Sequence, residues 1–396
     1  MRKLFALIVL SVGSVFTASG QGGVTYIYNY DWSVITGDPS GVAKNDSGNV
    51  FVTDYTDNSV QKYASDGGFN LRWGTPGSAN GQLSQPVGIA VDTSGYVYVT
   101  ERGNNRVQKF STTGTYITQW GSTGTGDGQF NFPCGIALDA LGNVYVTDNG
   151  NNRVQKFTSS GVYITQWGVF GTAAGQFSSP GGIAVHADSV YVIDGNNRLQ
   201  KFSTTGVYIT EWGAPGQFHI QPAQGGIVYN VLGVSKTGDV FVADNGDYNV
   251  KVYTSSGNFI TQWGTQGNGA GQFNNPIGVA VDSVGRVFVI DKNNSAVSVF
   301  NVDPSGVESL QYAAKTFVYP NPASESIMLQ ISSTENANAV VGIYDVLGQK
   351  IWSENMSLVN GQNKITLSTQ DLCNGLYLVK ISSDSLQSSF PLVIQR

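Results

Sequence analysis

One segment of the chain is repeated several times, and this repetition constrains the fold more than any other feature. The clearest copy runs from Gly128 to Gly168 and reads GQFNFPCGIALDALGNVYVTDNGNNRVQKFTSSGVYITQWG. A close copy precedes it at Gly81–Gly121, and weaker copies continue in both directions. A period of roughly 45 residues is typical of repeat architectures, in which neighbouring units bury each other's apolar faces. The period is marked by Trp32, Trp73, Trp120, Trp167, Trp212 and Trp263.

Each repeat predicts a four-stranded antiparallel sheet. In the clearest copy, runs rich in Val, Ile, Tyr and Phe are separated by short segments of Gly, Asn and Ser, which favour turns. The first run contains small residues and the last contains bulky ones, so the predicted sheet is wedge-shaped. A radial array of such wedges is a β-propeller. The four predicted strands are Gly135–Leu138, Val144–Thr147, Arg153–Phe157 and Val162–Trp167.

The number of copies predicts six blades. The fifth copy is irregular, because the segment between Gln217 and Gly233 is longer than its counterparts, and its first strand is expected within Ile227–Lys236. Two spare β-patterned segments, Val24–Trp32 and Gly306–Tyr312, could each complete the last blade and remove an open edge. The sequence leaves open which of them closes the ring. The first strands begin at Gly41, Gly88, Gly135, Gly182, Gly233 and Gly278.

These units resemble NHL repeats. The matching motifs are the GQF opening, P-x-G-I-A-V-D, G-N-V-Y-V-T-D, N-N-R-V-Q-K-F and a final W-G, and they recur over residues 24–314. The resemblance implies an all-β, six-bladed propeller, but not one activity, because propellers carry unrelated functions. Some NHL propellers bind RNA on a basic face. This chain has 21 Lys and Arg and a formal charge of −6, which argues against a nucleic-acid partner.

The first 20 residues have the pattern of a secretory signal peptide. Arg2 and Lys3 precede the apolar run Leu4–Val15, and small residues follow, so cleavage is expected between Gly20 and Gln21. The apolar run is shorter than the ~20 residues that a membrane-spanning helix needs. We therefore expect a secreted protein without a transmembrane span.

After Tyr312 the period ends, and a different β pattern begins. Seven short runs predict a small immunoglobulin-like β-sandwich. This tail resembles the C-terminal sorting domain of the bacterial type IX secretion system, through VGIYDVLGQKI, NGLYLVKI, the terminal LVIQR and a YPNPA motif that contains Tyr319, Pro320, Asn321 and Pro322. The resemblance implies the type IX machinery as a partner and a location outside the cell or on its outer surface. An adhesive or carbohydrate-binding sandwich is the alternative. The predicted parts are a signal peptide at 1–20, a propeller at 21–314 and a sorting domain at 315–396.

An acidic residue ends the second strand of every repeat. Six equivalent carboxylates on one side of a propeller could bind Ca²⁺, which prefers oxygen ligands. The alternative is architectural, because each acid begins a turn rich in Asn and Gly, where it can accept backbone N–H bonds and pair with a following arginine. The architectural interpretation is favoured. No cofactor is therefore expected, and Ca²⁺ is the one cofactor that the pattern could hold. The six residues are Asp54, Glu101, Asp148, Asp194, Asp244 and Asp291.

Histidine and cysteine are too few to predict a metal or disulfide framework. The chain has only His186 and His219, whereas a catalytic zinc ion usually has three protein ligands. Cys134 is expected to be buried as an apolar residue, and a disulfide with Cys373 is not expected.

The departure of the fifth repeat from the pattern suggests a binding loop. Its candidate residues are His219, Gln221, Tyr229 and Asn230.

The sequence contains no nucleophile motif and no phosphate-binding loop, so we hypothesise a non-catalytic module that binds an extracellular protein or glycan. The alternative is a secreted lactonase- or lyase-like propeller that uses a divalent cation. A third possibility is a structural component of the cell surface.

Overall fold

The computed structural model describes residues 26–34, 37–213, 217–221, 231–302, 316–319, 325–333, 336–345, 349–359, 361–383 and 387–394. The chain divides into two compact units, Met1–Gly306 and Val307–Arg396. The domain boundaries predicted after residues 20 and 314 lie outside the described residues and stay predictions. None of the described helical segments has the length and apolar character needed to cross a bilayer.

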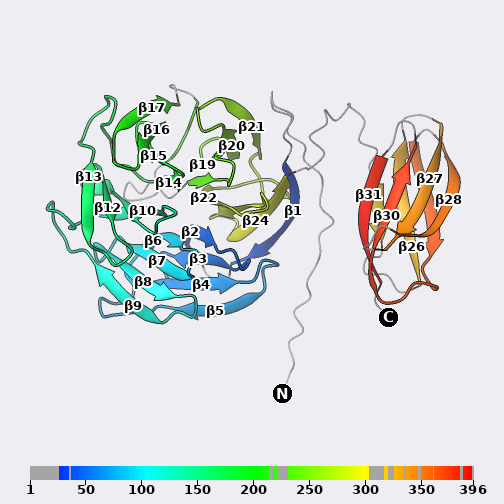
Figure 1. The fold of residues 1–396 in the computed structure, drawn as a ribbon, viewed down its shortest axis with the longest axis horizontal. Helices are drawn as coiled ribbons and strands as arrows, with labels where there is room; N and C mark the ends of the chain where they lie inside the picture. The colour runs from blue at the N-terminus through cyan, green and yellow to red at the C-terminus, as the bar shows by residue number, and fades with distance from the viewer. Residues whose placement is uncertain are drawn as a thin grey trace, which may run out of the picture. The chain divides into compact units, whose positions relative to one another are not determined.

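The first unit contains six four-stranded antiparallel sheets arranged as the blades of a propeller (Figure 1). Blade three corresponds to the clearest repeat, and its strands pair in sequence order. They begin and end within two residues of the predicted bounds, so the four-stranded unit is confirmed. A single 3₁₀ turn, η1 (Asn149–Asn151), follows the second strand. The strands are β10 (Pro133–Leu138), β11 (Val144–Asp148), β12 (Arg153–Phe157) and β13 (Tyr163–Trp167).

The other blades repeat this order. Blade one has β2 (Pro39–Lys44), β3 (Val50–Asp54), β4 (Ser59–Tyr63) and β5 (Phe69–Trp73), and blade two has β6 (Pro86–Val91), β7 (Tyr96–Glu101), β8 (Arg106–Ser111) and β9 (Tyr116–Trp120). Blade four has β14 (Ile183–His186), β15 (Ser189–Asp194), β16 (Arg198–Ser203) and β17 (Tyr208–Trp212), and blade five has β18 (Leu232–Val234), β19 (Val240–Asp244), β20 (Asn249–Tyr253) and β21 (Phe259–Trp263). Blade six has β22 (Pro276–Val281), β23 (Val287–Asp291) and β24 (Ala296–Val302), together with β1 (Tyr26–Ser33).

The small first strand of each blade faces the axis. These inner strands contact one another in order around the propeller, and β22 contacts β2, so the ring is closed. Glycine is required where they meet. A Cβ atom at Gly135 would lie 2.3 Å from the carbonyl oxygen of Gly181, and one at Gly88 would lie 2.3 Å from that of Cys134. The predicted taper from a narrow inner strand to a bulky outer strand therefore has a direct steric basis.

The N-terminal strand completes the last blade. β1 pairs antiparallel with β24, from Tyr26 opposite Val302 to Ser33 opposite Ala296. Of the two closing segments that the sequence offered, the first is thus paired, and the other, Gly306–Tyr312, lies outside the described residues. The Tyr26 ring stacks on Trp263 of blade five, with centroids 4.3 Å apart. The strand therefore removes an open edge from blade six and packs against blade five.

The middle strands form the interior. Every residue of β11 is buried, whereas burial in β13 alternates along the strand, which is typical of an outer strand with one exposed face. Five of the six outer tryptophans pack against a hairpin glycine of the next blade, as Trp120 does against Gly161, whereas Trp263 packs against Tyr26 of β1. Gly161 has a φ of 89°, so a side chain here would be strained and would also clash with the indole ring.

The second unit is a two-sheet β structure. One sheet has the order β25-β26-β29 and the other β28-β27-β30-β31, and both contribute to one buried apolar cluster. The predicted β-sandwich is present, while its immunoglobulin-like topology stays a prediction. β28 is an edge strand, and its many polar residues lack the apolar alternation that marks a strand in the sequence. The strands are β25 (Thr316–Tyr319), β26 (Ser326–Ser333), β27 (Ala337–Tyr344), β28 (Lys350–Leu358), β29 (Gly361–Ser368), β30 (Gly375–Ser382) and β31 (Gln387–Ile394).

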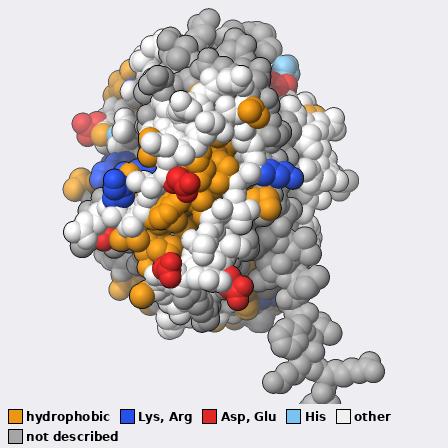
Figure 2. Space-filling model, turned by 90° about the vertical axis from the view of Figure 1, so that its right-hand side faces the viewer, with side chains coloured by type: hydrophobic (Ala, Val, Ile, Leu, Met, Phe, Trp, Pro, Cys, Tyr) orange, Lys and Arg blue, Asp and Glu red, His pale blue; other side chains and the backbone are white. Residues whose placement is uncertain are grey.

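Exposed apolar side chains occur in both units. Figure 2 shows one face of the molecule, on which hydrophobic side chains gather in a band bordered by acidic and basic ones. Among the described residues of the second unit, the large hydrophobic residues with exposed side chains are Val340, Ile351 and Val359.

Candidate functional site

The six predicted acids are all buried at the ends of their strands. Asp148 shows the typical contacts. Its carboxylate accepts hydrogen bonds from the Asn131 amide at 2.7 Å, from Asn151 Nδ2 at 2.8 Å and from Arg153 Nε at 2.8 Å. Burial raises the pKa of Asp148 above its ordinary value, and these donors only partly offset that effect. The carboxylate therefore holds the inter-blade loop, the turn and the third strand together.

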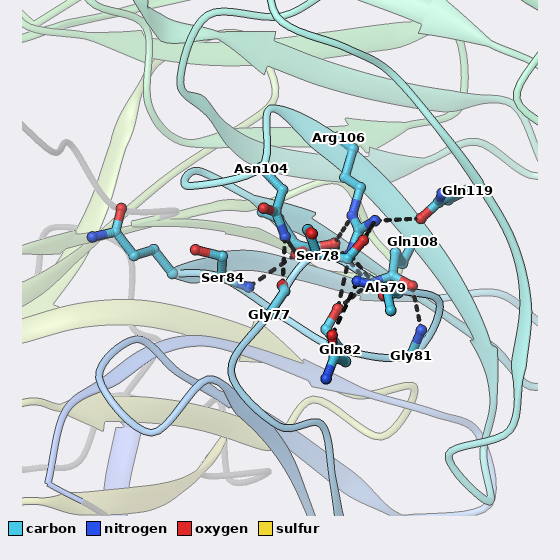
Figure 3. A network of polar contacts seen from close by, with 12 residues as sticks. Gly77, Ser78, Ala79, Gly81, Gln82, Ser84, Asn104, Arg106, Gln108 and Gln119 are labelled. Carbon is cyan, nitrogen blue, oxygen red and sulfur yellow. Dashed lines mark hydrogen bonds and ion pairs between the residues drawn. The ribbon is translucent and has the colours of Figure 1, made fainter.

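The following arginine extends this network to the loop that connects two blades. In blade two, Arg106 pairs with Glu101, and its guanidinium donates to the carbonyl oxygens of Ser78 at 2.7 Å and Gln82 at 2.9 Å (Figure 3). Gln119 on the outer strand accepts a further hydrogen bond from the same group. The arginine thus ties three strands of its blade to the preceding loop. Arg153 and Arg198 make the equivalent contacts in blades three and four.

The Asn-Asn pair before the arginine has two separate roles. Asn151 Nδ2 donates to Asp148 and to the carbonyl oxygen of Gly124, 2.8 Å away, and so fastens the loop. Asn152 adopts a left-handed φ of 56°, which Asn tolerates better than most residues. Its Oδ1 accepts a 2.8 Å hydrogen bond from the amide of Ser179 in the segment leading to blade four. The Asn-Asn-Arg motif is therefore a connector between blades.

The charge partners of the six acids differ. Glu101, Asp148 and Asp194 pair with arginine, and Asp244 pairs with Lys251. Asp54 and Asp291 accept backbone hydrogen bonds, and neither forms an ion pair with a Lys or Arg of the described residues. Burial raises the pKa of Asp291, and amide donors oppose this shift without cancelling it.

Among the described residues, His219, Asp244 and Asp247 form a group that could hold a metal ion. Their candidate ligand atoms lie within 4.8 Å of one another. The ammonium group of Lys251 lies among these residues, 2.7 Å from Asp244 Oδ2 and 2.6 Å from Asp247 Oδ2. Burial raises the pKa of Asp247, but hydrogen bonds from Lys251 and His219 outweigh burial, so the pKa lies below its usual value. Of the six Ca²⁺ candidates, Asp244 alone belongs to this group.

The candidate loop of blade five is anchored at its start. The His219 amide donates to Asp244 Oδ2 at 3.0 Å, and the Gln221 amide donates to Asn245 Oδ1 at 2.7 Å. The His219 ring is about half exposed and contacts Asp247. His219 therefore belongs to the metal-capable group, and Gln221 is held by the residue that follows Asp244. Tyr229 and Asn230 lie outside the described residues.

Polar contacts also join blade six to blade one and blade two to blade three. Lys292 lies 2.6 Å from Asp38 Oδ1, and Arg102 Nη1 donates to Cys134 Sγ at 3.6 Å. Burial raises the pKa of the Cys134 thiol to about 11 despite the nearby guanidinium. Cys134 is buried, as predicted, and both it and Cys373 are free cysteines.

The predicted processing and sorting residues are mostly outside the described part of the chain. Gly20, Gln21, Pro320, Asn321 and Pro322 belong to the residues that the structure does not describe. Tyr319 ends β25, the first strand of the second unit.

Comparison with known protein families decides what these repeats and this tail are. The family described as NHL repeat matches residues 83–110, 130–157 and 273–300, and the secretion system C-terminal sorting domain matches residues 317–395. The chain is an NHL-repeat propeller protein with a C-terminal sorting domain. This type of tail directs export through the type IX secretion system, so the protein reaches the cell surface or the outside.

Among curated proteins, the NHL region is similar to NHL repeat-containing protein 3. The identity is 39% over 75 residues for the Homo sapiens protein and 37% over 75 residues for that of Mus musculus. Each match covers 18% of this chain and 22% of the relative, so the chain spans less than a quarter of the length of the relatives it matches.

Among solved structures, a streptogramin B lyase has a TM-score of 0.50 and 16% identity, covering 72% of this chain and 100% of that chain. Virginiamycin B lyase from Staphylococcus aureus has a TM-score of 0.48 and 17% identity, covering 70% of this chain and 99% of that chain. At this level of identity, the likeness of the first structure shows a shared propeller fold alone.

The NHL propeller has a distinctive loop that the sequence reasoning missed. Val169 and Phe170, between blades three and four, are 60% and 73% exposed. The preceding inter-blade loop has Ser122 and Thr123 at the same positions. A position-by-position comparison of the repeats would have found this departure, because it places an aromatic side chain where other loops are polar or small.

Proposed function

We propose that this NHL propeller is an exported, non-catalytic module that binds an extracellular protein or glycan. The observation that carries the proposal is the exposed pair Val169 and Phe170 on one inter-blade loop. Apolar residues exposed together on a soluble protein are typical of interaction sites. Because the pair interrupts a repeated pattern, it points to one surface rather than to blade architecture.

We call Val169 and Phe170 the rim surface. An exposed aromatic side chain suits a protein partner better than a glycan, because protein interfaces depend on a few buried aromatic and apolar anchors. Val162 and Ile164 of blade three and Val207 and Ile209 of blade four are also exposed, but they occupy equivalent positions of successive blades and do not depart from the repeat.

The test is binding of the purified full-length chain to the outer surface of the cells that export it. Phe170→Ser is expected to weaken saturable binding at least tenfold, a loss of about 1.4 kcal/mol, which is within the range for an aromatic anchor. Leu141→Ser is the matched control, because Leu141 is 88% exposed on the turn between β10 and β11 and lies outside the rim surface. Equal binding by both variants would contradict a role for the rim surface.

A second candidate function is a divalent-cation-dependent lactonase- or lyase-like enzyme. The group of His219, Asp244 and Asp247 supports it, because these side chains offer three ligand atoms. The first proposal expects that dialysis against EDTA leaves cell-surface binding unchanged. Stoichiometric Ca²⁺ or Zn²⁺ in the purified protein, together with substrate turnover that EDTA abolishes, would favour the enzyme.

The proposal includes a signal peptide at residues 1–20, which would carry the chain into the periplasm before the sorting domain acts. The exported protein is then expected to begin at Gln21. N-terminal sequencing of the protein recovered from the medium or the cell surface measures this directly. An exported chain that still begins at Met1 would contradict cleavage after Gly20.

A further inference from the structure

Blades two, three and four each fill the same polar pocket with their own arginine. In blade three, the Arg153 guanidinium donates to the carbonyl oxygens of Thr125 at 2.7 Å, Gly126 at 2.9 Å and Gln129 at 2.8 Å. Gln166 on the outer strand accepts another hydrogen bond from it. Three loop carbonyls and one outer-strand side chain thus form a guanidinium-binding frame.

Blade six keeps the frame and lacks the arginine. Ala296 lies opposite Asp291 in the strand register, as Arg153 lies opposite Asp148. The loop is built in the same way, because Gln272 Oε1 accepts the Gly269 amide at 3.0 Å, a bond that Gln129 and Gly126 form in blade three. The carbonyl-bearing residues that correspond to the three arginine acceptors are Asn268, Gly269 and Gln272.

A cavity of about 370 Å³ lies where the arginine is missing. The outer strand of this blade is β1, and it places Asp31 opposite Ser298, the register position that Gln166 occupies opposite Gln155. An outer-strand amide is therefore replaced by a carboxylate, a stronger acceptor for a cationic donor. Residues lining the cavity include Asp31, Asn268, Gly269, Gln272, Ala296 and Ser298.

The charge at this place also differs from that of blades two and three. In blades two and three, one carboxylate is balanced by one arginine. In blade six, Asp31 lines the cavity and Asp291 lies opposite Ala296 in the strand register, and no described Lys or Arg forms an ion pair with either. A planar cation would supply both the missing charge and the missing donors.

We propose that the blade-six cavity binds the guanidinium group of an arginine side chain presented by a protein or peptide partner. The frame selects arginine over lysine because it matches several donors in one plane, whereas an ammonium group is a compact charge. The proposal does not depend on the rim surface, which lies between blades three and four. Its failure would leave the proposed function untouched.

The experiment is a ligand-observed NMR titration of the full-length chain with N-acetyl-arginine amide. N-acetyl-citrulline amide has nearly the same shape without the charge, N-acetyl-lysine amide has the charge without the plane, and CaCl₂ tests a simple cation. Saturable binding of the arginine compound is expected, with at least tenfold weaker binding of the citrulline and lysine compounds. Ca²⁺ at millimolar concentration is expected not to displace it.

Two variants locate the site. Ala296→Arg introduces the residue that blades two, three and four have at this position, so it should fill the cavity and weaken binding at least tenfold. Leu141→Arg adds the same charge to an exposed turn elsewhere and should leave binding unchanged. Asp31→Asn, on an exposed strand position, should weaken binding about tenfold, because it removes the charge of one acceptor and leaves a weaker neutral hydrogen bond. Equal binding of arginine and citrulline compounds, displacement by Ca²⁺, no saturable binding, or unchanged binding by Ala296→Arg and Asp31→Asn would each overturn the proposal.

Discussion

The amide nitrogen of Gly135 lies 3.1 Å from the carbonyl oxygen of Gly181, and this hydrogen bond joins the inner strand of blade three to the start of blade four. A β-carbon on Gly135 would lie 2.3 Å from the same oxygen. The spacing of the blades around the axis therefore requires glycine, which has no side chain, at position 135.

Gly135→Ala is expected to destabilise the propeller, because the added methyl group forces the backbones of two blades apart. The expected loss is about 1–3 kcal/mol, the usual cost of overpacking. Gly278→Ala is the matched control, since a Cβ atom there would lie 3.5 Å from Val42 Cγ1, an ordinary contact. Urea unfolding of both variants measures the difference. Equal losses would contradict the steric account.

Arg153→Met should be strongly destabilising, because it leaves the buried carboxylate of Asp148 and several loop carbonyls without their donor. Removing one partner of a buried ion pair typically costs about 3–5 kcal/mol. The control is Arg72→Ala, which removes an exposed pair with Asp57 at 3.4 Å and should cost less than about 1 kcal/mol. Thermal unfolding of the two variants measures the loss of stability in each. A larger loss in Arg72→Ala than in Arg153→Met would contradict this prediction.

The contact between blades six and one should make stability depend on pH. Burial raises the pKa of Asp282, but hydrogen bonds from Arg286 and the charge of Lys44 outweigh it, so the folded-state pKa lies below the ordinary value. A depressed pKa contributes stability that is present above the unfolded pKa of about 4 and is lost as pH falls through the folded value. Asp282→Asn should therefore cost about 1–3 kcal/mol at pH 7 and much less at pH 3. Urea unfolding at both pH values measures this, and a cost that does not shrink on acidification would be inconsistent with it.

The closing strand should be essential for a monomeric ring. A chain that begins at Val34 lacks β1, leaves the edge of β24 open and exposes the Trp263 face that Tyr26 covers. It is expected to unfold at lower urea concentration and to associate through the open edge. A chain that begins just before Tyr26 is the control. Light scattering and urea titration compare the two, and a monomeric shortened chain with an unchanged midpoint would argue against closure by β1.

The repeats predicted most of the propeller, because each copy carries its own turn residues and apolar strands. The number of blades, the four strands per blade and the buried position of Cys134 all follow from local patterns. The closing strand could only be narrowed to two segments, because pairing between Tyr26 and Val302 joins distant parts of the chain. Strand pairing at such a separation leaves no local signal.

The departures between blades were harder to predict. In blade five, Asn249 replaces the arginine and Lys251 supplies the positive charge instead. This replacement can be recognised only from the contacts of Lys251 with Asp244 and Asp247. The cavity beside Ala296 could not be predicted from the sequence for a related reason. Arginine is held largely by backbone carbonyls, and any residue type supplies a carbonyl.

The central claim is that this exported propeller binds a partner through one surface that departs from the repeat. The most direct measurement is photocrosslinking in the cells that export the chain, with a photoreactive amino acid at Phe170 and, in a separate variant, at Leu141. Discrete adducts from position 170 and none from position 141 are predicted. The same adducts from both positions, or none from either, would contradict the account.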